Sequence, residues 1–138
     1  MQTTMRQYTQ HNVRTATPGQ LVVMLYDGMI RFLQQAAAAM ERGEPGEAGL
    51  KMSRAQAIVT ELRCTLDMTQ GSISENLAAV YDWATDEMTA ARMSRDPARL
   101  GPVIRGMTEL RGAWAQIAGT ARPDVETRRP VVGVNLAG

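Results

Sequence analysis

Residues 16–28 read Ala-Thr-Pro-Gly-Gln-Leu-Val-Val-Met-Leu-Tyr-Asp-Gly and decide the fold. Thr17 can cap the free amides of a helix, Pro18 suits the first helical position, and Gln20 can reach back to complete a capping box. A nearly unbroken apolar run follows over residues 21–33. A helix at the rim of a small bundle needs only one apolar stripe. This helix is therefore either central or offers a second apolar face to something else.

The rest of the chain predicts three further helices with clear stop and start signals. The Gly-Glu-Pro-Gly stretch at 43–46 ends the first helix and forms a short loop. Gly71 ends the second, and Ser72 with Glu75 predicts a capping box for the third. The Asp-Pro pair at 96–97 begins the fourth. The predicted helices cover about residues 18–42, 47–70, 73–95 and 97–119.

Helices of this length joined by short loops run antiparallel to their neighbours. We therefore predict an all-α fold, an antiparallel up-down-up-down four-helix bundle over residues 17–119, with no strands. Residues 1–16 are predicted to form an N-terminal arm, because they are polar with few apolar points. Residues 120–138 mix prolines, glycines and charges without a helical period, which predicts a flexible C-terminal tail. The apolar run at 131–136 leaves a second possibility open, which is docking in a groove as a strand-like peptide.

The sequence offers no catalytic machinery. Its single histidine, His11, lies in the predicted arm, and the chain has no Glu-x-x-His pair and no glycine-rich phosphate loop. The lone Cys64 permits no internal disulfide or cysteine metal site, and the helical pattern predicts a buried or half-buried position for it. A formal net charge of +1 argues against an extended nucleic-acid footprint. We expect no enzyme, no cofactor and no bound metal.

No apolar run reaches about 18 residues, so we expect no segment that inserts into a membrane. Residues 1–12 lack the apolar core of a signal peptide, which favours a cytoplasmic (cytosolic) protein. The chain has ten methionines and one phenylalanine. Methionine suits surfaces that adapt to a partner, so this bias favours a binding protein.

Several short motifs, each weak alone, occur in a fairly specific order between residues 5 and 118. They are Tyr8-Thr9-Gln10, Thr17-Pro18 with Gln20-Leu21, Met24-Leu25-Tyr26-Asp27-Gly28, Leu66-Asp67 with Gly71, Asn76-Leu77, Tyr81-Asp82-Trp83, Leu110-Arg111 and Ala113-Trp114 with Ile117. In this order the chain resembles the bacterial flagellar secretion chaperone family, FliS. It departs from the family pattern at residues 71–74, where a double glycine and an acidic residue are usual.

The resemblance implies a cytoplasmic flagellar export chaperone. It would bind the disordered C-terminal segment of flagellin, prevent premature polymerisation, and deliver flagellin to the flagellar type III export gate. The resemblance also implies docking on the cytoplasmic domain of that gate through the N-terminal region, here Met5 and Tyr8. The alternative is a homo-oligomeric structural bundle without a client peptide, whose surplus apolar face would form a homodimer interface.

The candidate flagellin-binding groove is formed by apolar residues on or beside the core stripes of the second and fourth helices. They are Ile58, Leu62, Leu66, Met107, Leu110 and Trp114. Trp114 also fits the core, whereas Trp83 is expected to be half exposed, either as a partner anchor or as rim packing. Asp27 is expected to pair with Arg31 four residues on, or to fix the arm through a loop contact. Gly28 would let a neighbouring helix or a bound peptide approach closely.

Overall fold

The structure is a computed structural model that describes residues 16–120 of the chain. Over these residues the chain forms four long α-helices and two single-turn 3-10 helices, with no strand. In chain order the elements are α2 (Pro18–Glu41), α3 (Pro45–Cys64), η1 (Met68–Gln70), α4 (Ser72–Ser94), η2 (Pro97–Arg99) and α5 (Leu100–Thr120). Of the predicted arm and tail, only Ala16 and Thr120 fall in this range, so Met5 and Tyr8 lie outside the described residues.

Local hydrogen bonds explain where α2 and the short helix η2 begin. Thr17 Oγ1 accepts a hydrogen bond from the backbone N–H of Gln20 over 3.2 Å, and Gln20 Oε1 accepts one from the backbone N–H of Thr17 over 2.9 Å. The predicted capping box is thus confirmed. Asp96 also caps a helix, by accepting from the Ala98 N–H over 3.0 Å. That helix is the short η2, however, and α5 begins only at Leu100.

The second helix is shorter than the sequence predicts. α3 ends at Cys64 instead of continuing to residue 70. Asp67 then starts the separate turn η1, because its carboxylate accepts a hydrogen bond from the Thr69 N–H over 3.0 Å. Cys64 is exposed, so the expectation of a buried or half-buried cysteine is wrong.

The capping box predicted for α4 does not form. Gly71 is the N-cap residue, with a φ of 74°, and Ser72 is already helical with no side-chain cap. The positive φ suits glycine, which carries no Cβ, and it turns the chain from η1 into α4. Ser74 stabilises this turn from inside, since its hydroxyl donates a hydrogen bond to the backbone carbonyl of Asp67 over 2.7 Å.

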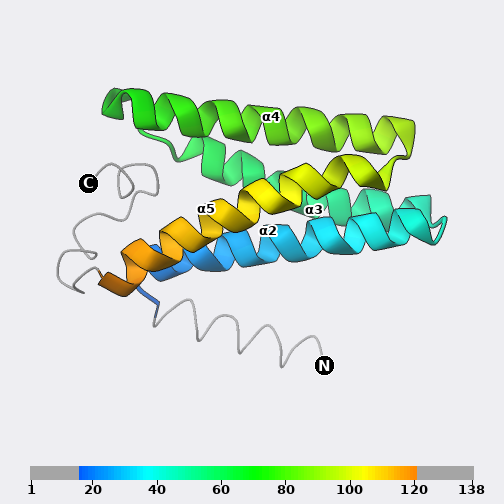
Figure 1. Cartoon of the computed structure of the whole chain (residues 1–138), viewed down its shortest axis with the longest axis horizontal. Helices are drawn as coiled ribbons and strands as arrows, with labels where there is room; N and C mark the ends of the chain where they lie inside the picture. Colours follow the sequence, from blue (N-terminus) through cyan, green and yellow to red (C-terminus); the bar gives the residue numbers. More distant parts are fainter. Residues whose placement is uncertain (1–15, 121–138) are drawn as a thin grey trace.

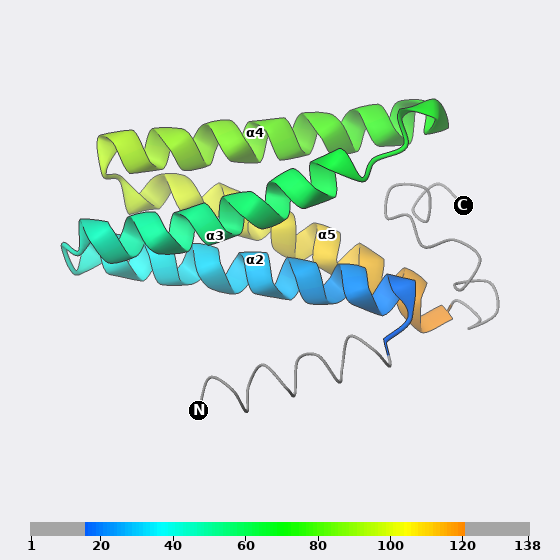
Figure 2. The same ribbon diagram turned by 180° about the vertical axis from the view of Figure 1, so that it is seen from behind.

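The four helices run alternately up and down and form the predicted antiparallel bundle (Figure 1). α2 packs mainly against α3 and α5, while α4 lies on the other side and contacts α3 and α5. α5 is inclined to the other helices: it starts beside the end of α4 and finishes beside the start of α2 in both views (Figures 1 and 2). The C-terminal half of α5 therefore separates from the N-terminal half of α4.

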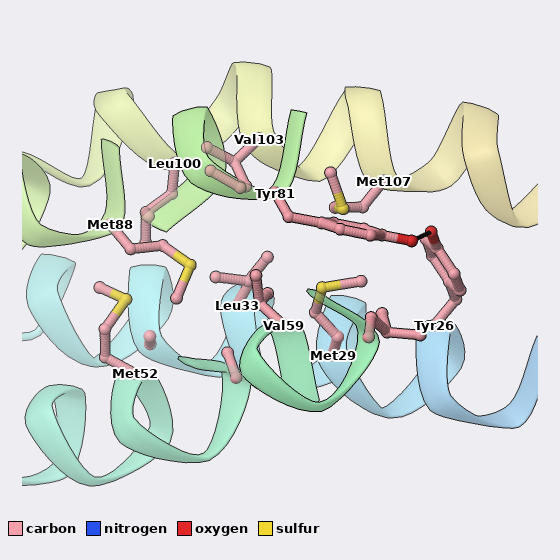
Figure 3. Close-up of a cluster of buried hydrophobic side chains, with 14 of the residues drawn as sticks. Tyr26, Met29, Leu33, Met52, Val59, Tyr81, Met88, Leu100, Val103 and Met107 are labelled. Carbon is pink, nitrogen blue, oxygen red and sulfur yellow. Dashed lines mark hydrogen bonds between the residues drawn. The ribbon is translucent and has the colours of Figure 1, made fainter. Parts of the chain in front are cut away.

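All four helices contribute to one hydrophobic core (Figure 3). Its largest fully buried side chains are Trp114, Tyr26, Tyr81, Met29, Leu33, Leu62, Met88, Leu100 and Met107. Four methionines, Met29, Met52, Met88 and Met107, lie in this core with at most 2% exposure. The methionine bias therefore serves packing at these positions, and only the remaining methionines are available to a surface.

Candidate partner-binding surfaces

Three consecutive residues of α2 each contact a different one of the other three helices. The hydroxyl of Tyr26 forms a buried hydrogen bond with the hydroxyl of Tyr81 on α4. The carboxylate of Asp27 pairs with the Arg111 guanidinium on α5, with Nε 2.8 Å from Oδ1. A Cβ placed on Gly28 would lie 3.5 Å from Cδ1 of Ile58 on α3. The Tyr-Asp-Gly motif at 26–28 thus contributes to packing between the helices of the bundle.

These contacts correct the expectations for Asp27. Asp27 pairs with Arg111, 84 positions away in the sequence, and not with Arg31. The arm, which the second expectation involved, lies outside the described residues. The close approach at Gly28 is made by a side chain of the neighbouring helix α3. Of the two possibilities left open for Gly28, the structure therefore contains the contact with a neighbouring helix.

Burial changes the acidity of the tyrosine pair. The two hydroxyl oxygens lie 2.5 Å apart inside the bundle, where Tyr26 of α2 meets Tyr81 of α4 (Figure 3). Burial raises the pKa of Tyr26, although the hydrogen bonds of its hydroxyl oppose the shift. Burial also raises the pKa of Tyr81 far above its ordinary value, and the neighbouring Tyr26 raises it further. The indole Nε1–H of Trp114 is also buried, close to the Tyr26 hydroxyl. Among the described residues, no acceptor meets the distance and angle of a hydrogen bond to it. The two uncharged tyrosines therefore join α2 to α4 inside the core, where a substrate cannot reach them.

The six predicted groove residues divide into two groups. Leu62, Met107 and Trp114 have no exposed surface, so none of them lines a surface groove in this conformation. The other three, Ile58, Leu66 and Leu110, are half-buried against the core. Ile58 covers Gly28 on the side where α3 meets α2, whereas α3 and α5 do not pack extensively against each other. The six residues therefore do not form one groove.

Several partly exposed apolar side chains lie on α4 and α5 where the two helices separate. At one end of this region an ion pair joins Glu87 Oε2 of α4 to Nη1 of Arg99, the last residue of η2, at 3.2 Å. The Trp83 ring follows, 3.7 Å from where a Cβ on Gly106 would lie. Toward the start of α4 and the end of α5 the two helix axes part (Figure 1). We call this region the α4–α5 surface; it comprises Ile73, Val80 and Trp83 on α4 and Leu110 on α5.

The residues of the α4–α5 surface share one face of each helix. Ile73 and Val80 are seven residues apart, Trp83 follows Val80 by three, and Leu110 lies one turn beyond Gly106. Ile73 is 41% exposed and Trp83 is 37% exposed, so large apolar side chains meet solvent here. The expectation of a half-exposed Trp83 is confirmed. The sequence analysis missed Ile73, although its spacing to Val80 and Trp83 could have revealed it.

A second apolar groove lies between the first turns of α2 and the last turns of α5. It has a volume of about 350 Å³ and is lined by Gln20, Val23, Met24, Ala115, Ala118 and Gly119. We call it the α2–α5 groove. Small residues on α5 create the space, since alanine and glycine face the longer side chains of α2. This groove was not predicted from the sequence, because alanine and glycine in a helix carry no strong signal of a binding site.

A third hollow, between α3 and α4, has a different lining. It measures about 220 Å³ and is bordered by Met52, Ser53, Gln56, Met88, Thr89, Arg92 and Met93. Met93 is 81% exposed at its edge. Arg92 crosses from α4 to α3, where its Nη2 lies 3.1 Å from the Cβ position of Gly49. This hollow is at the opposite end of α4 from Ile73.

Comparison with known proteins identifies the type of bundle. The family model described as flagellar protein FliS matches residues 1–121. The chain belongs to the FliS family. It is 34% identical over 117 residues to the flagellar secretion chaperone FliS of Bacillus subtilis, covering 85% of this chain and 87% of that protein. It is 37% identical over 103 residues to FliS of Vibrio cholerae, covering 74% and 76%. A third relative, FliSB of Pseudomonas aeruginosa, is 30% identical over 119 residues, covering 83% and 94%.

Membership of the FliS family confirms the resemblance found in the sequence. The family consists of flagellar secretion chaperones and not of enzymes, so its members act in flagellar export and assembly by binding. None of the helices between residues 16 and 120 combines the length and hydrophobicity that crossing a bilayer requires. The apolar surfaces of this FliS bundle are accordingly the places to look for a protein partner.

Proposed function

We propose that the chain binds the disordered C-terminal segment of flagellin in the cytosol, prevents its premature polymerisation and delivers it to the flagellar type III export gate. The single observation that carries this proposal is the exposed α4–α5 surface on a chain of the FliS family. A chaperone for a disordered segment needs a rigid frame with apolar side chains at its surface. The bundle supplies the frame, and the partly exposed Ile73 and Trp83 supply the apolar contacts.

The α4–α5 surface is our proposed flagellin-binding site, together with Leu66 in the short loop that follows α3. Exposed aromatic and aliphatic side chains of this kind are common anchors of protein interfaces. Leu110, predicted from the sequence, remains in the proposed site. Leu62, Met107 and Trp114 are fully buried, so we do not place them in direct contact with flagellin in this conformation. Ile58 faces another side of the bundle, where a client that wraps around the helices would reach it.

We further propose that the N-terminal region docks on the cytoplasmic domain of the export gate. The proposal rests on the family and on the sequence, in which Met5 and Tyr8 are spaced to share one face of a helical turn. The test is a Tyr8→Ala variant loaded with flagellin. It should keep flagellin binding and lose affinity for the isolated gate domain. Unchanged gate binding would contradict the role given to Tyr8.

The experiment for client binding titrates a labelled peptide of the flagellin C-terminal segment into the chain and into three variants. Ile73→Asp should raise the Kd by about tenfold or more, equivalent to about 1.4 kcal/mol, because it places a charge in an apolar contact. Ile73 lies in the first turn of α4, where an acidic residue is compatible with the helix dipole, so the variant should fold. Leu110→Asp should act in the same direction from α5.

Met93→Asp is the matched control, since Met93 is a highly exposed apolar residue of α4 at the far end of the helix. It should leave the Kd within about twofold of the parent chain. Equal losses for all three variants would show that an added charge disturbs binding wherever it lies on α4 or α5, and would contradict the proposed site. If the peptide does not bind and the α4–α5 variants instead dissociate a homodimer, the chain is the homo-oligomeric bundle of the alternative hypothesis.

A further inference from the structure

The α2–α5 groove has an apolar lining, and no described segment fills it. Val23 and Met24 of α2 face Ala115 and Ala118 of α5 across a space of about 350 Å³. A closed apolar cavity of about 150 Å³ already accommodates a benzene molecule, so this groove can receive two branched aliphatic side chains. Its lining has no charged residue, because Gln20 is its only side chain with a strongly polar group. The occupant that fits is therefore a short aliphatic segment.

The chain itself carries such a segment close by. Gly119 lines the groove, and the chain continues for 18 residues beyond Thr120, the last residue of α5. Residues 131–136 read Val-Val-Gly-Val-Asn-Leu. In an extended backbone, alternate side chains share one face, so Val132, Val134 and Leu136 would point the same way.

The reach of the chain permits this docking. Residues 121–130 can span at most about 36 Å, at up to about 3.6 Å per residue, and they start at the groove. The chain can therefore leave α5, reverse and return with slack. Tethering also raises the local concentration of the segment to about the millimolar range, so modest contacts suffice.

We propose that residues 131–136 of the chain dock in cis into the α2–α5 groove, with the face formed by Val132, Val134 and Leu136 against Val23, Met24, Ala115 and Ala118. The N-terminal arm precedes α2 in the chain, but it has only separated apolar residues, Met5, Tyr8 and Val13. The aliphatic run at the C-terminus matches the small, uncharged lining better. This docking concerns the chain alone and does not depend on flagellin binding.

The methionine methyl groups provide the test. In the full chain labelled with ¹³C at the methionine methyls, Met24 reports on the groove, whereas Met52 and Met88 report on the core between α3 and α4. A Met24→Leu variant assigns the signal. Deleting residues 121–138 should move the Met24 signal by more than its linewidth and leave the signals of Met52 and Met88 in place.

Two full-length variants separate docking from the effect of shortening α5. Val134→Asp with Leu136→Asp should reproduce the shift caused by deletion, because both changes lie on the docked face. Val131→Asp with Asn135→Asp carries the same added charge on the opposite face and should keep the Met24 signal of the parent chain. Circular dichroism checks that all the variants remain helical.

Three results would overturn the proposal. One is a Met24 signal that is the same with and without residues 121–138. Another is a Met24 signal that moves only when residues 2–15 are removed, which would place the arm in the groove. The third is a shift that disappears on dilution, which would place the tail of a second copy there.

Discussion

Asp27 of α2 and Arg111 of α5 are joined by two hydrogen bonds across the bundle, Nε to Oδ1 over 2.8 Å and Nη2 to Oδ2 over 3.4 Å. The acceptor carboxylate raises the pKa of Arg111. Both side chains are partly exposed, at 40% for Arg111 and 47% for Asp27. The pair therefore orients α5 on α2 more than it stabilises the fold, because water and salt screen partly exposed charges.

The first prediction concerns this ion pair. Asp27→Asn should lower the free energy of unfolding by about 0.2–1 kcal/mol, as is usual for exposed pairs. The loss should shrink when the salt concentration rises from about 0.01 M to about 1 M, where the screening length falls to about 3 Å. Urea denaturation at both salt concentrations measures it. Asp82→Asn, which removes the exposed pair with Arg63 between α4 and α3, is the matched comparison. A loss of several kcal/mol that ignores salt would contradict the orienting role.

The second prediction concerns the hydrogen bond between Tyr26 and Tyr81. Tyr81→Phe leaves the buried Tyr26 hydroxyl without this partner, so it should cost about 1–3 kcal/mol of stability. Removing both hydroxyls should cost less than the sum of the two single changes, because no orphaned hydroxyl remains. A double-mutant cycle by chemical denaturation measures the coupling. Strictly additive losses would mean that the two hydroxyls do not depend on each other.

The third prediction is the pH dependence that follows from the same pair. The pKa of each tyrosine is raised in the folded state above its ordinary value of 10.0. The unfolded chain therefore loses these protons first, so stability is intact below about pH 10 and falls as the pH rises above it. A tyrosine that ionises in the unfolded chain but stays protonated in the folded state makes stability fall by a slope that approaches about 1.4 kcal/mol per pH unit above about pH 10. Unfolding free energies between about pH 9 and 11 measure the slope, and the variant with both Tyr26→Phe and Tyr81→Phe should lose most of it. The same slope in that variant would show that other groups cause the fall.

The fourth prediction concerns Gly28. Its absent Cβ would lie in ordinary contact distance of Ile58, at 3.5 Å, so alanine fits without displacing the neighbour. Gly28→Ala should raise stability by about 0.5–1 kcal/mol, since alanine favours the helix over glycine. Gly28→Leu should instead cost about 1–3 kcal/mol, because the longer side chain meets Ile58. Thermal denaturation of both variants checks the opposite signs. A destabilising Gly28→Ala would show that the helices need a closer approach than the structure has.

The sequence predicted the helices well because their signals are local. The capping box of Thr17 and Gln20 needs only residues three apart, and it formed as expected. The box expected from Ser72 and Glu75 failed because Gly71 takes the cap position with a positive φ. That conformation also suits the tertiary bond from Ser74 to Asp67. The spacing of Ser72 and Glu75 alone could not show that this interaction competes with the capping box.

The partners across the bundle could not be predicted in the same way. Asp27 had an acceptable local partner in Arg31, but the pairing with Arg111 depends on how α5 lies against α2. The binding surface has the same origin, because the inclination of α5 leaves Ile73 and Trp83 exposed. Helical periodicity identifies the apolar face of each helix. It does not specify the angle at which two faces meet, and so it could not separate half-buried Leu110 from the buried core.

The most direct measurement of the central proposal is the mass of the complex formed when the full chain is produced together with flagellin. After purification through the chaperone, size-exclusion chromatography with light scattering should give a complex of one chain and one flagellin. The Ile73→Asp variant should release flagellin, while Met93→Asp should retain it. A chain that purifies without flagellin, as a dimer of itself that Ile73→Asp separates into monomers, would contradict the proposal that the α4–α5 surface holds an export client.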